Sequence, residues 1–326
     1  MKKRLNKKAE MTKEQVLGLI VLVVSIGVLL LFLSGIIPWG RTSIDKDTCH
    51  TSVVLRSTYN SALFESSKII PLKCQTENIC SNMGGKCTDL PRIDTNVKLS
   101  KDDEQAKEQL KKTIADKLYD CNSMVGEGKL NFMPHTFWSQ NYCLICSRIS
   151  FDEGSKKIGN LGYQDLYEYM AKTKAYDDTS YLEAIYGTKS LEDMNKILES
   201  SIDAINKRAG TKIESIDELS IDLSKDNGYA IIVQLTPDST WEQWTATIAG
   251  GALVAGGIIA APLTLGGSLS ISGVGFAVLA GGTTGGIIYT KTFPGDGDYV
   301  YTYPSIIPYD KETLKSLKCS SFETAP

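Results

Sequence analysis

Uninterrupted runs of apolar residues occur at two places in an otherwise mixed chain. The first covers residues 16–37, which contain seventeen Val, Leu, Ile or Phe side chains and no charge. About 20 residues in a helix are enough to cross a hydrocarbon core of about 30 Å. The pattern therefore predicts a transmembrane helix within residues 1–40, with Trp39 at the interface.

The second apolar run is rich in glycine. The 48 residues 243–290 carry no charge, and the polar turn at 266–268 divides them into two halves of near-membrane length. Small residues recur at every fourth position, which lines one face of a helix and lets helix backbones approach closely. We therefore predict a Gly-rich helical hairpin over residues 241–291. Its predicted packing positions are Ala252, Gly256, Ala260, Gly273, Ala277, Gly281 and Gly285.

Three environments are compatible with this hairpin. Each half carries only seven or eight large aliphatic or aromatic side chains, so its insertion into a bilayer is only marginally favourable. The hairpin can rest in the bilayer, enter it on a signal, or stay packed within protein. Alternating strands are disfavoured because the apolar residues show no period of two.

Residues 41–240 alternate short strand patterns with amphipathic helix patterns. Strands are predicted at 51–58 and 143–151, and helices at 101–121, 163–172 and 190–207. The first helix would start at a Ser100 cap and bury a stripe at every fourth residue, namely Ala106, Leu110, Ile114 and Leu118. Alternating runs on both sides of Asp226-Asn227-Gly228 predict a β-hairpin over 219–235. This mixture indicates an α+β domain rather than a parallel βαβ fold.

Charge sets the expected orientation. Six basic residues precede the first apolar run, whereas the two that follow it are mixed with acidic residues. The basic flank is expected to stay in the cytoplasm, so the bulk of the chain would be extracytoplasmic at the cell membrane. The formal net charge of −3 shows no overall excess of basic residues of the kind that would predict nucleic-acid binding.

Eight cysteines lie beyond the first apolar run, on the side where disulfides form. An even count in an exported chain indicates a disulfide framework. For the CxxC pair Cys143 and Cys146, three interpretations remain open: structural disulfides, a redox pair, or half of a zinc site. The predicted disulfide cysteines are Cys49, Cys74, Cys80, Cys87, Cys121, Cys143, Cys146 and Cys319.

Enzyme motifs are weak throughout. The stretch "VGEGKL" lacks the first glycine and the Ser or Thr of a phosphate loop. His50 adjoins a cysteine and His135 lies among aromatic residues, so neither predicts a catalytic base. Asp296 and Asp298 lack the remainder of a calcium loop. We therefore predict no catalytic, cofactor-binding or metal-binding residue.

The N-terminal stretch "KKAEMTKE" resembles a class III type IV pilin signal. It has a basic pair, Ala9, a polar residue and then the apolar helix. The resemblance implies processing after Ala9, which would make Glu10 the first residue and put Glu14 fifth, although Lys13 departs from the pattern. An uncut anchor is the alternative.

Three further stretches resemble uncharacterised membrane-anchored extracytoplasmic proteins of small-genome archaea. They are "CHTSVVLRST…PLKCQTENIC", "DCNSMVGEGKLNF" and "PSIIPYDKETLKSLKCSSFE". The resemblance implies an extracytoplasmic location and supplies no catalytic residues.

These patterns predict a disulfide-stapled α+β extracytoplasmic domain with an N-terminal transmembrane helix and a Gly-rich helical hairpin. The expected divisions are a cytoplasmic flank and anchor (1–40), the ectodomain (41–240), the hairpin (241–291) and a C-terminal tail tied to the ectodomain (292–326). The expected function is a structural or interaction role at the cell envelope. The expected partners are membrane lipid and either a second copy of this chain or another envelope protein. Alternatives are a pore-forming or membrane-perturbing protein, a pilin-like subunit, and a thiol-redox envelope enzyme.

Overall fold

The four-residue apolar repeat between 106 and 118 forms the buried face of helix α3 (Asp103–Met124) in the computed structural model of the chain. The helix begins at Asp102 rather than Ser100, because the Asp102 side chain accepts a hydrogen bond from the backbone N–H of Gln105. Ser100 instead accepts a hydrogen bond from the backbone N–H of Asp102. The predicted stripe is confirmed, since all four of its side chains are buried.

The structure describes residues 41–59, 71–132, 141–176, 178–196, 219–237, 258–263, 274–279, 287–292, 299–317 and 319–323, together with positions 22, 23, 25, 26, 199, 214 and 215. The chain divides into two units, Met1–Ile44 and Asp45–Pro326. In the first unit, positions 22, 23, 25 and 26 are helical. Within the described residues, no helix combines the length and the apolar character that a membrane crossing requires. The predicted span 16–37 otherwise lies outside these residues.

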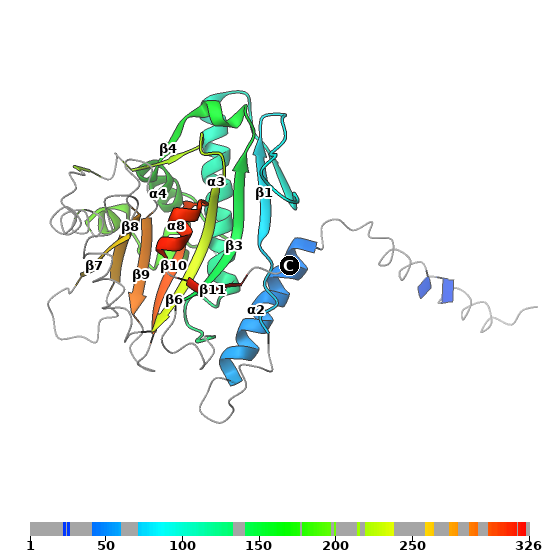
Figure 1. Ribbon diagram of the computed structural model, residues 1–326, viewed down its shortest axis with the longest axis vertical. Coiled ribbons are helices and arrows are strands. Elements are labelled where there is room, and N and C mark those ends of the chain that lie inside the picture. Colours follow the sequence, from blue (N-terminus) through cyan, green and yellow to red (C-terminus); the bar gives the residue numbers. More distant parts are fainter. Residues whose placement is uncertain are drawn as a thin grey trace, which may run out of the picture. The chain divides into compact units, whose positions relative to one another are not determined.

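Helices and strands are mixed along the chain up to residue 219, and the described elements beyond it are strands except for α8 (Figure 1). Besides α3, the described helices are α2 (Arg41–Tyr59), η2 (Ser155–Ile158), α4 (Tyr163–Lys172), α5 (Tyr181–Tyr186) and α8 (Lys311–Ser316), and residues 191–196 are also helical. The first strands are β1 (Glu77–Asn82), β2 (Thr95–Lys98), β3 (Asn141–Phe151), β4 (Asn160–Gly162), β5 (Ser220–Asp222) and β6 (Tyr229–Pro237). The later strands are β7 (Ile258–Leu263), β8 (Val274–Leu279), β9 (Ile287–Thr292), β10 (Tyr299–Pro308) and β11 (Cys319–Glu323).

Nine of these strands form one mixed sheet. Its order is β2-β1-β3-β6-β10-β9-β8-β7, and β11 pairs with β3 off this path. β1 pairs in parallel with β2 and β3, and β11 pairs in parallel with β3, whereas all other neighbours in this sheet are antiparallel. The sheet contains both parallel and antiparallel pairs, and the helices do not alternate regularly with its strands as they do in a parallel βαβ fold. This arrangement confirms the α+β class.

Helices cover one face of the central strands. α3 packs against β3, β6 and β10, and α4 and α5 pack against α3. Asn122 of α3 ties this layer together, because its amide donates to the carbonyl of Ala184 in α5 and its Oδ1 accepts from Tyr301 of β10. Tyr301 therefore faces the helices.

The short helix α8 lies on the opposite face. Successive residues of a strand point to opposite faces, so Thr302 points away from α3 if Tyr301 points toward it. Gln234, which pairs with Thr302, donates from its side chain to the carbonyl of Leu317 at the end of α8. Figure 1 shows α8 and α3 on the two sides of the sheet. Leu317 and partly buried Leu314 belong to the core on this face.

Besides α3, one predicted strand and one predicted helix are confirmed, and another predicted strand is corrected. β3 and α4 occupy the predicted strand 143–151 and helix 163–172, and residues 191–196 are helical within the predicted helix 190–207. The predicted strand 51–58 is instead part of α2. The buried residues of α2 follow the period of a helix, and they are Cys49, Ser52, Val53 and Arg56. The packing of this helix against the core overrides the β preference of its valines.

The hairpin predicted over 219–235 is wrong in its pairing. β5 and β6 both form, but β5 pairs with β4 in a separate two-stranded sheet, and β6 enters the large sheet. The buried Tyr229 hydroxyl lies between them. The hydroxyl accepts a hydrogen bond from the Asp222 N–H at 2.6 Å and donates one to the Asp222 carbonyl at 3.1 Å. The Tyr229 side chain thus satisfies backbone groups of β5 that a hairpin would pair with the backbone of β6.

The helical hairpin predicted over 241–291 is also wrong in its described parts, which are β7, β8 and β9. Ala260 of β7 and Ala277 of β8 are direct cross-strand partners in the sheet, not positions on two packed helices. A four-residue repeat is also a multiple of two, so it places small residues on one face of a strand as well as a helix. Gly256 and the other packing positions, Ala252, Gly273, Gly281 and Gly285, lie outside the described residues.

Candidate functional site

All eight cysteines form disulfides, which confirms the predicted framework. The pairs are Cys49–Cys74, Cys80–Cys87, Cys121–Cys146 and Cys143–Cys319. They join α2 to the segment before β1, β1 to the following loop, α3 to β3, and β3 to β11. The last pair spans 176 residues of sequence and ties the C-terminal strand to the centre of the sheet.

The CxxC pair is structural. Cys143 and Cys146 are three residues apart on β3, so their side chains leave opposite faces of the strand. Cys146 meets α3 on the helical face, and Cys143 meets β11 on the other. The two sulfurs are therefore not partners, and this arrangement excludes a dithiol–disulfide couple formed by these two residues.

Asp152 follows β3 directly, and its buried carboxylate is surrounded by hydrogen-bond donors of the fold. It is 3% exposed and accepts hydrogen bonds from Ser155 Oγ (2.6 Å), from the backbone N–H groups of Ser155 (2.8 Å) and Gly85 (2.7 Å), and from Met83 N–H (3.2 Å). Burial alone would raise its pKa, but these hydrogen bonds outweigh burial and lower the pKa of Asp152. The carboxylate thus holds the loop closed by Cys80–Cys87 against the end of β3.

A second polar network joins the N-terminal helix to the sheet. Lys117 of α3 contacts Glu77 of β1 at 2.8 Å and Asp120 at 3.5 Å, and Lys46 of α2 pairs with the same Asp120. Burial alone would lower the pKa of Lys117, but the charges of Glu77 and Asp120 outweigh burial and raise it. These groups are paired with one another, which is typical of an internal ion-pair network.

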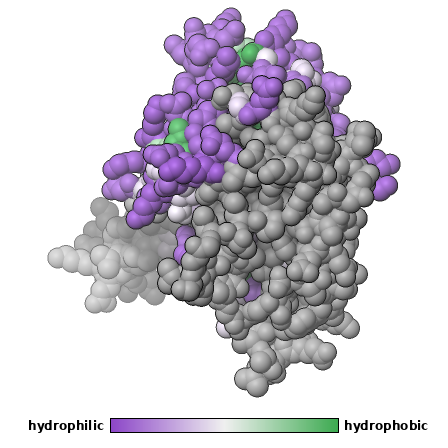
Figure 2. Space-filling model, turned by 90° about the vertical axis from the view of Figure 1, so that its left-hand side faces the viewer, coloured by the Kyte–Doolittle hydropathy of each residue, from purple (hydrophilic) through white to green (hydrophobic). Residues whose placement is uncertain are grey.

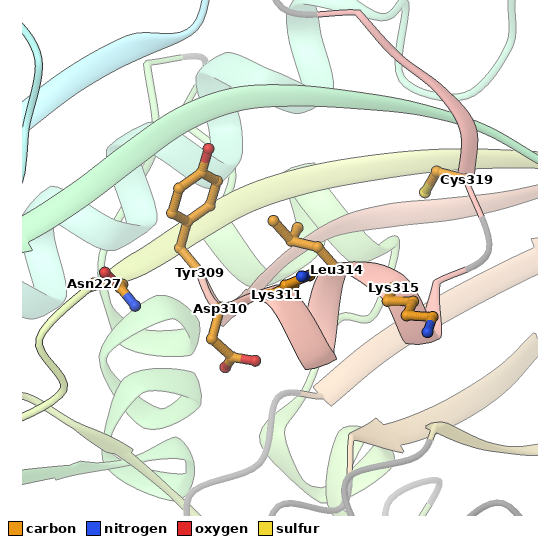
Figure 3. Close-up of a pocket in the computed structure, with 7 residues that line it drawn as sticks. All are labelled: Asn227, Tyr309, Asp310, Lys311, Leu314, Lys315 and Cys319. Carbon is orange, nitrogen blue, oxygen red and sulfur yellow. The ribbon is translucent and has the colours of Figure 1, made fainter.

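The candidate binding site is a groove on the α8 face of the sheet, with a volume of about 560 Å³. α8 contributes Lys311, Leu314 and Lys315 to its lining. Asn227, Tyr309, Asp310 and Cys319 complete it, and the residues are spread in a row from Asn227 at one end to Cys319 at the other (Figure 3). A volume of this size lies within the range of small-ligand sites.

Tyr309 forms a wall of this groove and is held by Arg148 of β3. The Arg148 guanidinium lies 4.3 Å from the centroid of the Tyr309 ring. Arg148 is itself bound by Asp89 at 3.3 Å and by the carbonyl of Asn227 at 3.5 Å. Asp89 also accepts from Ser150 on the same strand. The wall is therefore positioned by a cation–π contact and an ion pair.

The groove was not found from the sequence. Lys311 and Lys315 are four residues apart, and this spacing places both on one face of a helix. The surrounding sequence matches no known ligand-binding motif, so the spacing alone does not indicate a site. Asn227 was singled out only as a turn residue. The contact of Tyr309 with Arg148 joins positions 161 apart in the sequence, so no local pattern indicates it.

The remaining sequence candidates do not converge on this groove. His50 lies on α2, with Nδ1 3.3 Å from the carbonyl of Met124. The predicted processing residues Ala9, Glu10 and Glu14 lie outside the described residues, as do His135, Asp296 and Asp298. Where the structure describes side chains, no three His, Cys, Asp or Glu residues gather as metal ligands would.

The side of the molecule viewed in Figure 2 has a hydrophilic surface wherever its residues are described, with only small hydrophobic spots. Among described residues, the most exposed large hydrophobic side chain of the second unit is Tyr176, at 77%. Single exposed hydrophobic side chains of this kind are common on protein surfaces.

Comparisons with protein-family models, with curated proteins and with solved structures found no match for this chain.

Proposed function

We propose that this protein is a membrane-anchored extracytoplasmic domain with a structural or interaction role at the cell envelope. The observation that supports this proposal is the pairing of all eight cysteines in four disulfides. Structural disulfides persist in oxidising compartments and are rare where cellular thiols are kept reduced. The basic residues before the apolar run 16–37 favour retention of the N-terminus in the cytoplasm, with the cysteines on the other side.

The polar groups of the interior favour a binding or scaffolding role. The ionisable side chains Asp152 and Lys117, whose pKa values are shifted, are engaged by partners within the fold, and those partners join loops and elements together. The described segments of 241–291 are strands, so self-association through packed helices is not part of this proposal.

Membrane topology tests the proposal directly. The full chain is expressed in bacterial cells, membranes are washed with alkaline carbonate, and protease is applied to intact spheroplasts. The matched control lacks residues 16–37. We expect the full chain to remain with the washed membranes and its residues beyond 41 to be digested from outside, while the control is released from the membrane. Recovery of the full chain in the soluble fraction, or its protection from external protease, would contradict the proposal.

A pilin-like subunit is a second candidate. It is supported by helix α2, which begins at Arg41 soon after the apolar run and buries Cys49 and Val53 in the domain core. Co-expression with an archaeal prepilin peptidase should then yield a mature chain that begins at Glu10, as measured by intact mass. Replacement of Ala9 by Leu should block the cut. A wild-type chain that keeps Met1 under these conditions eliminates this candidate.

A further inference from the structure

The groove beside α8 has an apolar floor with a charged rim. Leu314 is partly buried and packs against the core, and Cys319 is held there by its disulfide to Cys143. Lys311 and Lys315 are exposed. Side chains at positions i and i+4 of a helix lie about 6 Å apart along its axis, so the two ammonium groups flank Leu314 on one rim.

Both lysines are available to a ligand. Neither has an ion-pair partner among the described residues. The neighbouring carboxylate is already engaged, because Asp310 accepts from the backbone N–H of Thr313 at 2.8 Å and from its hydroxyl at 2.9 Å to cap α8. The lining therefore carries two lysines against one aspartate, and both oxygens of that aspartate accept hydrogen bonds from Thr313. The free charge of the rim is positive, which selects an anion.

The other end of the groove is pre-organised. Tyr309 is fixed by Arg148 on one face of its ring, and Asn227 is exposed beside it, with its backbone carbonyl already accepting from Arg148. A side-chain amide in this position can exchange hydrogen bonds with a peptide backbone. A site whose walls are held in place before binding loses little conformational entropy when it binds.

We propose that this groove binds an acidic peptide segment in an extended conformation. In an extended chain, residues i and i+2 lie on one side and are about 6.5 Å apart, which matches the spacing of Lys311 and Lys315 along α8. Carboxylates at these two positions pair with the lysines, and the methylene groups of the same two acidic side chains pack on Leu314. The row of lining residues from Asn227 to Cys319 suits an extended chain better than a compact ligand (Figure 3). Binding at this groove does not depend on membrane anchoring.

The test uses the full chain in nanodiscs of neutral lipid, with empty nanodiscs as the reference. Saturation-transfer NMR titrations compare the peptide Ac-Ser-Leu-Glu-Leu-Glu-Leu-Ser-NH2 with its counterpart in which both glutamates are glutamine. The variant is Lys311→Gln/Lys315→Gln, which removes both charges and keeps side-chain length. The matched control is Lys101→Gln/Lys189→Gln, since these two lysines are also exposed but lie outside the groove. Thermal unfolding checks that both variants fold.

We expect the acidic peptide to bind more tightly than the glutamine peptide. Loss of the groove lysines should weaken its binding roughly fivefold to tenfold, because each exposed ion pair contributes modestly. The control variant should bind as the wild type does, and added salt should weaken binding. Equal binding of both peptides, equal loss in the control, or no detectable binding overturns the proposal. Benzoate serves as a third ligand: lysine-dependent binding of benzoate without binding of the acidic peptide would also overturn it and indicate a small free acid.

Discussion

Replacing Asp152 by asparagine should destabilise the domain strongly although the two side chains have nearly the same shape. The carboxylate is 3% exposed and both of its oxygens accept hydrogen bonds. An amide keeps one acceptor oxygen but presents an NH2 group in place of the other. That NH2 would face the backbone N–H of Met83 and Gly85, or that of Ser155, and neither arrangement satisfies all donors.

The magnitude follows from these contacts. A hydrogen bond to a charged group contributes about 1.5–3 kcal/mol, and a buried donor left without a partner costs about 1–3 kcal/mol. Because the surrounding loop can relax in part, we expect Asp152→Asn to lower the free energy of unfolding by about 2–4 kcal/mol at pH 7. The control is Glu153→Gln on the next residue, whose side chain is 87% exposed and pairs only with Lys156 among described residues. It should change stability by less than about 0.5 kcal/mol.

The assay is urea unfolding of the full chain without reductant, followed at several pH values. The native hydrogen bonds lower the pKa of Asp152, so its contribution to stability is complete above the unfolded-state pKa of about 3.9 and is lost as the pH falls through the lower native pKa. The difference between wild type and Asp152→Asn should thus be constant from pH 7 to pH 5 and shrink below about pH 4. A difference under about 1 kcal/mol at pH 7, or one that grows on acidification, would refute this account of the carboxylate.

Three further changes test the packing of the fold. Leu110→Ala, at a fully buried position of α3, should lower the free energy of unfolding by about 2–5 kcal/mol in the same urea assay. Gly228→Ala should lower the melting temperature clearly more than Gly187→Ala does. Both glycines have a positive φ, +65° and +69°, but of the two only Gly228 is placed so that a new Cβ would overlap a carbonyl of β3. Equal melting temperatures of the two variants would contradict this. Replacing Cys121 and Cys146 together by serine opens a link across 25 residues and should cost about 3 kcal/mol, as measured by thermal unfolding against the wild type.

Local periodicity predicted the elements whose environment is itself periodic. In α3 the buried stripe from Leu110 to Leu118 is separated by charged residues, and the many Lys, Glu, Gln and Ala residues of this stretch favour a helix over a strand. The apolar run 142–146 of β3 and the amphipathic pattern of α4 likewise indicated the observed structures. The cysteine count also predicted complete pairing, but not the pairs, because the sequence does not say which sulfurs the fold brings within bonding distance.

The tertiary structure decided every feature that depends on a distant partner. The segment 51–58 carries β-branched residues, yet its contact with the core made it part of α2. A turn at Asn227 and Gly228 was visible, but whether β5 or β10 lies beside β6 depended on the whole sheet. The candidate groove is the clearest case, since the pairing of β3 and β10 with β6 brings Arg148 close to Tyr309.

Three features can be read from the amino-acid sequence alone: the uncharged runs 16–37 and 243–290, the apolar faces of the regular helices, and the expectation that the eight cysteines pair with one another. It could not decide between helix and strand at Ala260 and Ala277, because a repeat of four residues lines one face of either structure. Only the sheet makes that choice, by placing these two alanines opposite each other on β7 and β8. The physical reason is that side-chain periodicity is local, whereas the backbone hydrogen bonds of a strand are completed by residues far away in the chain.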